Sequence, residues 1–266
     1  MTQIKSLSYT HCKKKVMPMR YALEMWKNTR MIVLVAVCAA IYAAALIAFK
    51  TAIPLIPGVT EVRVAGIFLM TFGVLFGPAG AWGLAIGNII GDLFGGTLGP
   101  ASIAGFFGNF LLGYLPYTMW VTFFPFSEKT YKWDTKSSRS WLAYISISII
   151  SSCSCGVLIG LIVDLLGIVP FQVISRIIAV NNIIGNLIGV VLLIAVYDIT
   201  KNQLSLLWTQ VMDVKPDGLS FRGILGAWLV AIGSIAGILG GFFPSLNIYG
   251  ANWASLVLIV FGSLIL

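Results

Sequence analysis

The sequence predicts an all-α membrane protein, built as a polytopic bundle with a six-helix core and a C-terminal addition of two helices. Of the 266 residues, 59% are hydrophobic and only 10% are charged, whereas soluble domains carry about 25% charged residues. The mean hydropathy is +0.97. Apolar runs of bilayer length recur along the chain, and about 20 helical residues span the hydrocarbon layer. Because a soluble surface needs polar cover, these observations exclude a cytosolic enzyme and a soluble binding module.

Eight apolar runs predict the helices. In chain order they are Arg30–Phe49, Val62–Phe76, Ala79–Phe94, Ile103–Phe124, Trp141–Leu166, Val173–Tyr197, Arg222–Phe243 and Ala251–Leu266. The second and third are short, so they form either two tilted spans or a re-entrant hairpin buried in protein. Both alternatives leave the sidedness of every later helix the same.

Four segments follow from this pattern. A basic arm covers residues 1–29, the six-helix core covers residues 30–200, a polar linker covers residues 201–221, and the two-helix addition covers residues 222–266. Pro216 and Gly218 interrupt the linker, which is typical of a connection between helices. No predicted loop is long enough to fold as a soluble domain.

Lysine and arginine residues collect on one side of the predicted bundle. With the N-terminus inside, all of them are cytoplasmic except Lys50, Arg63 and Arg176. Cytoplasmic loops of membrane proteins carry such an excess of cations. The net charge of +8 therefore indicates a multi-pass protein with a cytoplasmic N-terminus, and it gives no reason to expect nucleic acid as a partner.

Sequence motifs for catalysis are missing. The chain has no GxxxxGK[ST] phosphate loop, no HExxH and no GxSxG, and its single histidine, His11, lies in the basic arm. The acidic residues near the helices, Glu61, Asp92 and Asp164, are not adjacent to one another. We therefore expect no enzyme activity, no cofactor and no metal site.

Polar residues of the predicted helices lie on the outer side and extend toward the middle of the membrane. Polar side chains are costly in hydrocarbon and usually face a cavity or one another. We expect an outward-facing pocket for a small polar solute; the alternative for each asparagine is a hydrogen bond between helices. The candidate binding residues are Glu61, Arg63, Asn88, Asp92, Asn109, Asp164, Arg176, Asn181, Asn182 and Asn186.

Small residues form two helical stripes. Ala36, Ala40 and Ala44 are four residues apart in the first helix, and Gly233, Gly237 and Gly241 repeat this spacing in the seventh. Such stripes let helices approach closely. They serve either packing within the chain or docking of a partner membrane protein. Two segments rich in glycine or proline are candidate lids for the pocket, residues 50–60 and 95–102.

Three segments in order carry a resemblance to a known family: EVR at 61–63, FGVLFGPAG at 72–80 and GNIIGD at 87–92. Together with the alanine stripe, they resemble the substrate-binding S component of an energy-coupling factor (ECF) transporter. The resemblance implies capture of a vitamin or similar micronutrient from outside a prokaryotic cytoplasmic membrane. It also implies an ECF T component and ABC-type ATPase subunits as partners, docked through Ala36, Ala40 and Ala44. S components usually have six spans, so the last two predicted helices depart from the pattern.

We therefore expect a substrate-binding subunit of an ECF-type importer for a small polar micronutrient. One alternative is a self-sufficient secondary transporter, which would need ionisable residues deep in the bundle; no acid is predicted near the midplane. The other is a membrane assembly protein that transports nothing and works through its small-residue stripes.

Overall fold

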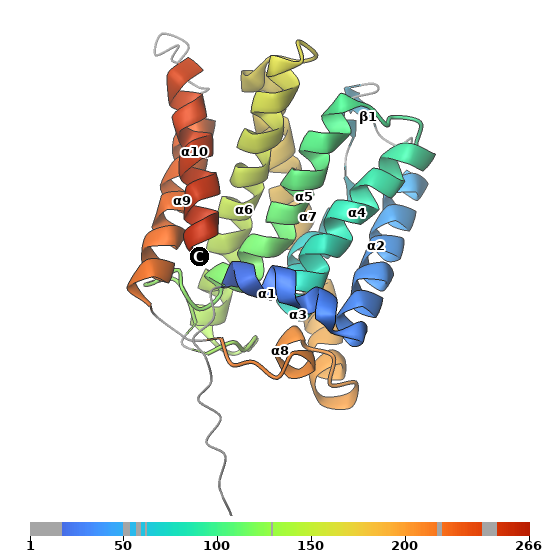
Figure 1. The fold of residues 1–266 in the computed structure, drawn as a ribbon, viewed down its shortest axis with the longest axis vertical. Helices are drawn as coiled ribbons and strands as arrows, with labels where there is room; N and C mark the ends of the chain where they lie inside the picture. Colours follow the sequence, from blue (N-terminus) through green and yellow to red (C-terminus); the bar gives the residue numbers. More distant parts are fainter. Residues whose placement is uncertain are drawn as a thin grey trace, which may run out of the picture.

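The computed structural model describes residues 18–49, 54–56, 60–61, 63–128, 130–216, 220–240 and 249–266. These residues form a helical bundle, as predicted, with one small antiparallel ribbon of two strands, β1 (Pro54–Ile56) and β2 (Thr60–Glu61). Figure 1 shows the ribbon at one end of the bundle, here named the β1 end. The opposite end carries a short helix, α8 (Trp208–Val211), and is named the α8 end.

Each predicted helix has a counterpart. These counterparts are α2 (Thr29–Phe49), α3 (Ile67–Phe76), α4 (Pro78–Phe94), α5 (Pro100–Met119), α6 (Ser138–Leu165), α7 (Phe171–Asp198), α9 (Phe221–Gly240) and α10 (Tyr249–Ile265). Shorter turns add α1 (Pro18–Glu24), η1 (Met25–Lys27), η2 (Val64–Gly66) and η3 (Ile199–Gln203). The fourth helix ends earlier than predicted because the chain folds back after Met119, where Glu128 N donates to the Trp120 carbonyl.

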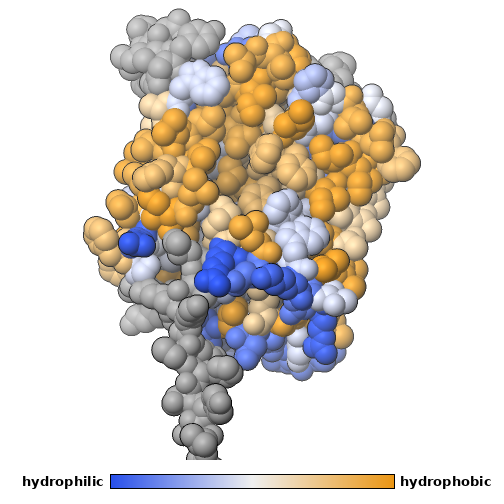
Figure 2. All heavy atoms as spheres, in the orientation of Figure 1, coloured by the Kyte–Doolittle hydropathy of each residue, from blue (hydrophilic) through white to orange (hydrophobic). Residues whose placement is uncertain are grey.

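The outer surface of the bundle is apolar. Four segments are long and apolar enough to cross a membrane: Thr29–Phe49, Ser138–Leu165, Phe171–Val211 and Phe221–Gly240. Large aliphatic side chains on these helices point outward, and Figure 2 shows them as a broad hydrophobic surface with hydrophilic residues gathered around α1. Soluble proteins rarely expose patches of this size, so this surface fits a lipid environment.

The helices α3 and α4 form a hairpin that runs along the bundle. With 10 residues, α3 is about 15 Å long, too short to span a bilayer by itself. The turn between them is Gly77, whose φ of +51° suits glycine. A Cβ at this position would lie 2.5 Å from the Trp208 ring. The turn therefore reaches the α8 end, while the segment that leads into α3 comes from the β1 end (Figure 1).

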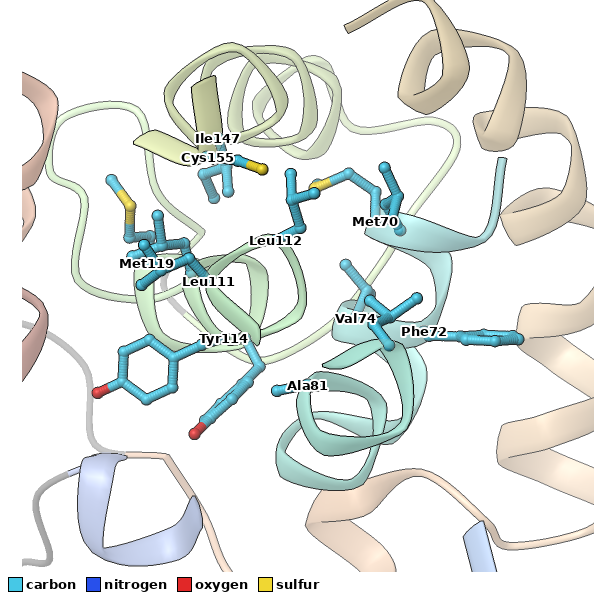
Figure 3. Packing of buried hydrophobic residues seen from close by; sticks show 14 of the residues in the cluster. Met70, Phe72, Val74, Ala81, Leu111, Leu112, Tyr114, Met119, Ile147 and Cys155 are labelled. Carbon is cyan, nitrogen blue, oxygen red and sulfur yellow. The ribbon is translucent and has the colours of Figure 1, made fainter. Parts of the chain in front are cut away.

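Close packing joins α2 to α4. A Cβ on Gly87 would lie 2.8 Å from the backbone oxygen of Ala39, and Gly83 packs in the same way against Cys38. Glycine at both positions lets the two backbones approach, as small residues do between membrane helices. Further inside, side chains of α3, α5 and α6 form the centre of the apolar core, including Met70, Leu112 and Ile147 (Figure 3).

The C-terminal pair α9–α10 packs on α6. Ser154 and Ser234 share a hydrogen bond of 2.6 Å between their hydroxyl oxygens, and the Tyr114 hydroxyl donates to the Ser263 carbonyl at 2.8 Å. Gly233 and Gly237 pack inside the chain against α10 and α6, so the glycine stripe serves internal packing there; Gly241 lies outside the described residues. In Figure 1 this pair and α2 stand on opposite sides of the bundle.

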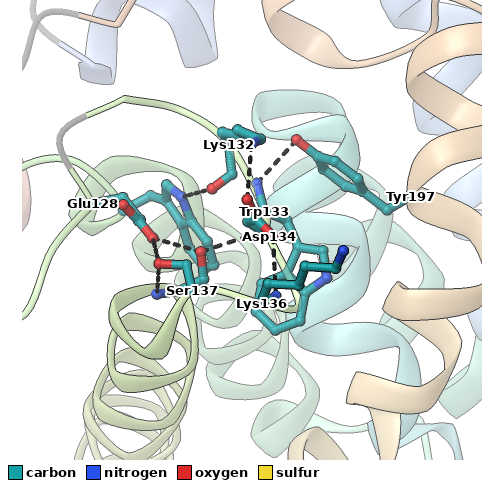
Figure 4. A network of polar contacts seen from close by, with 9 residues as sticks. Glu128, Lys132, Trp133, Asp134, Lys136, Ser137 and Tyr197 are labelled. Carbon is teal, nitrogen blue, oxygen red and sulfur yellow. Dashed lines mark hydrogen bonds and ion pairs between the residues drawn. The ribbon is translucent and has the colours of Figure 1, made fainter.

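Polar and aromatic groups close the α8 end. Trp208 contacts Tyr21, Tyr117 and Tyr131 through ring centroids 5.2 to 5.7 Å apart. The loop between α5 and α6 adds a polar network around Glu128 and Asp134 (Figure 4). In this network Glu128 accepts hydrogen bonds from Ser137 and Ser140, which fixes the start of α6.

Candidate functional site

A chain of buried polar side chains connects three helices near the middle of the bundle. Asn109 of α5 donates to the Asn88 side-chain oxygen at 3.0 Å, and Asn88 of α4 donates to Asp92 at 3.1 Å. Tyr42 of α2 donates to the Asn109 oxygen at 2.7 Å. Asn88 and Asn109 are at most 2% exposed. Since buried polar groups need partners, these bonds hold the side chains in one arrangement that ends in the half-buried Asp92 carboxylate.

Arg63 brings a positive charge to this chain from the segment before α3. Its guanidinium Nη1 lies 3.5 Å from the Tyr42 oxygen and 3.4 Å from the Asn109 oxygen. Both contacts are long for charged hydrogen bonds, which are usually 2.7 to 2.9 Å. The cation therefore lies beside the polar chain without being tightly held by these two groups.

The asparagines of α7 fall into two groups. Asn181 accepts a hydrogen bond from the Arg63 backbone N–H, and Asn186 accepts one from the Met70 backbone N–H, both at 3.1 Å. The Asn186 amide also donates to Ser152 of α6 at 3.2 Å. These two residues therefore fasten the segment 63–70 to α7. They satisfy backbone donors around the start of α3, where a helix has few acceptors of its own.

Asn182 is different. Its side chain is 1% exposed, and its amide nitrogen has no hydrogen-bond partner. It faces the fully buried thiol of Cys155 on α6, which also lies within electrostatic reach of Arg63. Sulfur is a weak acceptor, so the contact with Cys155 leaves the amide donor of Asn182 without a full hydrogen-bond partner.

The remaining predicted residues lie toward the β1 end. Asp164, near the end of α6, and Arg176, near the start of α7, are half-buried. Glu61 belongs to β2, and its side chain lies outside the described residues. Of the candidate lids, residues 95–99 form a turn and 100–102 begin α5, while residues 50–60 are described only in β1 and at Thr60.

The site offers acceptors and donors without the pattern of a catalytic or metal centre. Asp92 and amide oxygens accept, whereas Arg63 and the Asn182 amide donate. Among the residues that the structure describes, no group of three His, Cys, Asp or Glu side chains is close enough to hold a metal ion. The arrangement offers hydrogen-bond donors and acceptors to a small polar molecule.

The predicted docking residues share one exposed face of α2. Ala36, Ala40 and Ala44 are exposed, whereas Ala39 and Ala43 on the other side are buried against α4. The exposed face is thus free for contact with lipid or with another helix.

Comparison with protein families decides the identity. Residues 32–198 match the model of the QueT transporter family. The chain belongs to this family. QueT proteins are membrane transporters of a queuosine precursor, a small vitamin-like molecule, so the role of the chain is membrane transport. No curated protein and no solved structure matches the chain.

The QueT match runs from α2 to α7 and includes every residue of the polar site, whereas α1, α8, α9 and α10 lie beyond it. Two residues of the site were missed from the sequence, Tyr42 and Cys155. Tyr42 carried a usable signal, because a tyrosine inside an apolar helix needs a partner for its hydroxyl. Cys155 had no such signal, since cysteine is common among buried apolar residues.

Proposed function

We propose that this QueT protein is the substrate-binding S component of an ECF-type importer, which captures a queuosine precursor from outside the cell. The observation that carries the proposal is the hydrogen-bonded chain from Tyr42 to Asp92 inside the segment that matches the family. Support for the ECF arrangement comes from the sequence segments 61–63, 72–80 and 87–92 and from the alanine face of α2.

The chemistry of the site fits this solute. Queuosine is a modified purine-like nucleoside, so its precursor is a planar heterocycle with ring N–H groups, ring nitrogens and exocyclic polar groups. Asp92 accepts from N–H groups, and charged acceptors make stronger hydrogen bonds than neutral ones. The Arg63 guanidinium donates to the edge of the heterocycle that carries hydrogen-bond acceptors. The predicted binding residues Glu61, Asp164 and Arg176 would contribute at the entrance on the β1 end.

The same proposal sets the orientation. The cations of the loop 125–140 and of the linker support a cytoplasmic position for the α8 end, by the positive-inside rule. The entrance to the polar site would then lie at the β1 end, on the outside. Energy would come from a T component and ABC-type ATPases docked on Ala36, Ala40 and Ala44, and α9–α10 leaves that face uncovered because it packs on α6.

A self-sufficient transporter is less well supported. Coupling to an ion gradient needs ionisable groups deep in the bundle. The acids described within the helices near the polar site, Asp92 and Asp164, lie in the last turns at the β1 end. Arg63 reaches the polar chain, but a guanidinium stays protonated and cannot carry a coupled proton. A role in membrane assembly alone would leave the buried polar chain without a use.

The test measures binding and transport separately. The purified chain in detergent is expected to bind a radiolabelled queuosine precursor base with no other subunit present. Cells that cannot make the precursor are expected to take it up only when the T component and ATPases are co-expressed. Asp92→Asn should weaken binding about 10-fold or more, since a charged acceptor is lost.

Asp213→Asn is the matched control. Asp213 is exposed at the α8 end and has a φ of +48°, which asparagine also tolerates. This variant should bind as the unmodified chain does. Uptake into proteoliposomes by the chain alone, without ATP, would contradict the ECF proposal and favour a secondary transporter.

A further inference from the structure

The asparagines of the site differ in whether their amide donors are already used. Asn109 donates to Asn88 and to the Gly105 carbonyl, Asn88 donates to Asp92, and Asn186 donates to Ser152. Only the Asn182 amide nitrogen, among these four buried side chains, has no acceptor. The amides of Asn88, Asn109 and Asn186 are therefore used in bonds within the protein, whereas the Asn182 amide can donate to a ligand.

An unsatisfied donor at such depth is costly. Leaving a buried donor without an acceptor costs on the order of a few-fold to a hundred-fold in an equilibrium constant. A leucine or alanine at position 182 would avoid this cost in a membrane helix. The cost of the buried amide is offset if a molecule that enters the bundle accepts its hydrogen bond.

The position of Asn182 fits a contact with the solute. Its neighbours Asn181 and Asn186 bond the segment 63–70 to α7, while Asn182 lies against Cys155 on α6. A Cβ on Gly108 of α5 would lie 3.0 Å from the Cys155 sulfur, so α5, α6 and α7 meet here. Arg63 lies near the same thiol, and its guanidinium contacts Tyr42 and Asn109, so this point lies beside the polar chain.

We propose that Asn182 donates the hydrogen bond that sets the orientation of the bound heterocycle, with the Cys155 thiol beside the ligand. The inference rests on the proposed function. The solute then presents an acceptor, a ring nitrogen or a carbonyl oxygen, toward α7 and α6, and its N–H edge toward Asp92. Asn182 is then the residue that distinguishes this heterocycle from one with a donor at the same place.

Binding to the purified full chain tests the assignment. Asn182→Ala should weaken the affinity for a radiolabelled queuosine precursor base about 10- to 100-fold, in line with the loss of one buried hydrogen bond. Asn202→Ala, at an exposed position of η3, is the matched control and should bind as the unmodified chain does. Thermal unfolding of both variants checks that the fold is retained.

Thiol labelling gives a second measurement that does not depend on a variant of Asn182. Two chains each keep a single cysteine, Cys155 or Cys38, and react with methyl methanethiosulfonate with and without the precursor base. Both thiols are fully buried, but Cys38 belongs to α2 and packs against Gly83 of α4. The precursor should slow the labelling of Cys155 at least 10-fold and leave that of Cys38 unchanged.

The outcomes separate the two proposals. If the unmodified chain binds the precursor while Asn182→Ala binds equally well and Cys155 is not protected, the assignment of Asn182 is wrong and the proposed function stands. Equal protection of Cys155 and Cys38 would show general stabilisation of the fold and would also overturn the assignment. A chain that binds no precursor overturns the proposed function and this inference with it.

Discussion

At the scale of single residues, one amino-acid type performs several tasks in this bundle. Asn181 and Asn186 accept hydrogen bonds from backbone N–H groups, Asn88 and Asn109 extend a polar chain, and the Asn182 amide is left with a free donor. The difference comes from the direction each side chain takes around its helix. Position along the sequence gives the depth of an asparagine in the membrane, whereas its neighbours decide its use.

Replacement of Gly77 is predicted to be strongly destabilising for two reasons. Gly77→Ala combines a positive φ, which costs about 1–2 kcal/mol for other residues, with a clash against the Trp208 ring that adds about 1–3 kcal/mol. Gly96→Ala is the matched control, because Gly96 has a φ of +70° and nothing within 4 Å of an added Cβ. Thermal unfolding in detergent, followed by tryptophan fluorescence, should show a clearly larger loss for Gly77→Ala. Equal losses would mean that Trp208 adjusts without cost.

The ion pair of the α5–α6 loop predicts a pH dependence. A hydrogen bond from Lys132 at 2.9 Å lowers the pKa of Asp134, and the same bond raises the pKa of Lys132. Because the folded-state pKa of Asp134 is below its unfolded value of about 3.9, its stabilisation is complete above that pH. It is lost as the pH falls through the folded pKa.

Lys132→Ala should therefore lower the melting temperature slightly at pH 6 to 8. The difference from the unmodified chain should begin to shrink below about pH 4 and vanish once the pH is below the folded-state pKa of Asp134. Lys136→Ala is the control, since residue 136 binds Asp134 through its backbone N–H, which alanine keeps. A difference between the unmodified chain and Lys132→Ala that stays the same at acidic pH would contradict this explanation.

At the scale of elements, α2 has two faces with opposite tasks. Its buried face meets Gly83 and Gly87 of α4, whereas Ala36, Ala40 and Ala44 lie on the exposed face. In hydrocarbon, a flat face of small residues allows close contact with another helix. Contact with lipid alone does not require small residues at these positions. This arrangement agrees with docking of a partner, and it allows the two faces to be tested separately.

Ala40→Leu is predicted to leave folding and precursor binding unchanged and to reduce uptake with the ATPase subunits at least 10-fold, because the larger side chain holds the partner helix away. Ala39→Leu should instead destabilise the chain by about 1–3 kcal/mol through overpacking against Gly87. Ala236→Leu, on the exposed face of α9, controls for the added hydrophobic volume and should leave uptake intact. Normal uptake by Ala40→Leu would exclude the alanine face as the docking surface.

At the scale of the whole molecule, the parts outside the family match serve different ends of the bundle. The pair α9–α10 covers α6, while Trp208 of α8 closes the turn of the α3–α4 hairpin together with Tyr21 and Tyr131. Truncation of a buried tryptophan to alanine lowers the free energy of unfolding by about 3–5 kcal/mol. We expect the linker to matter more for stability of the core than the two helices that follow it.

Two shortened chains test this expectation. A chain that ends at Pro216 loses α9–α10 and is expected to keep precursor binding, because Ser154 still donates to the Ile150 carbonyl. A chain that ends at Gln203 also loses Trp208 and should unfold at a clearly lower temperature. In the chain that ends at Pro216, Tyr114→Phe should recover some stability, because the Tyr114 hydroxyl has lost its acceptor, the Ser263 carbonyl. Equal stability of the two shortened chains would contradict the role of Trp208.

Much of the fold was predictable from sequence because the membrane restricts backbone structure so strongly. Every backbone polar group in hydrocarbon must be bonded internally, so long apolar runs become helices, and the eight runs correspond to the helices from α2 to α10, α8 excepted. The charged loops indicated an orientation for the same reason, since crossing the bilayer with cations is costly. The transport class followed from short segments at 61–63, 72–80 and 87–92, and the family match agrees with it.

Only the tertiary structure decided which face of each helix meets which neighbour. Hydrophobic periodicity carries little information when lipid and protein interior are both apolar, so α2 could not be divided into a packing face and an exposed face from sequence. For the same reason the glycine stripe of α9 could not be distinguished from the alanine stripe of α2, although the first packs inside the chain. The sequence by itself determined the helices and their class, and the contacts between helices determined that Tyr42 and Cys155 join the site and that Asn182 keeps a donor without a partner.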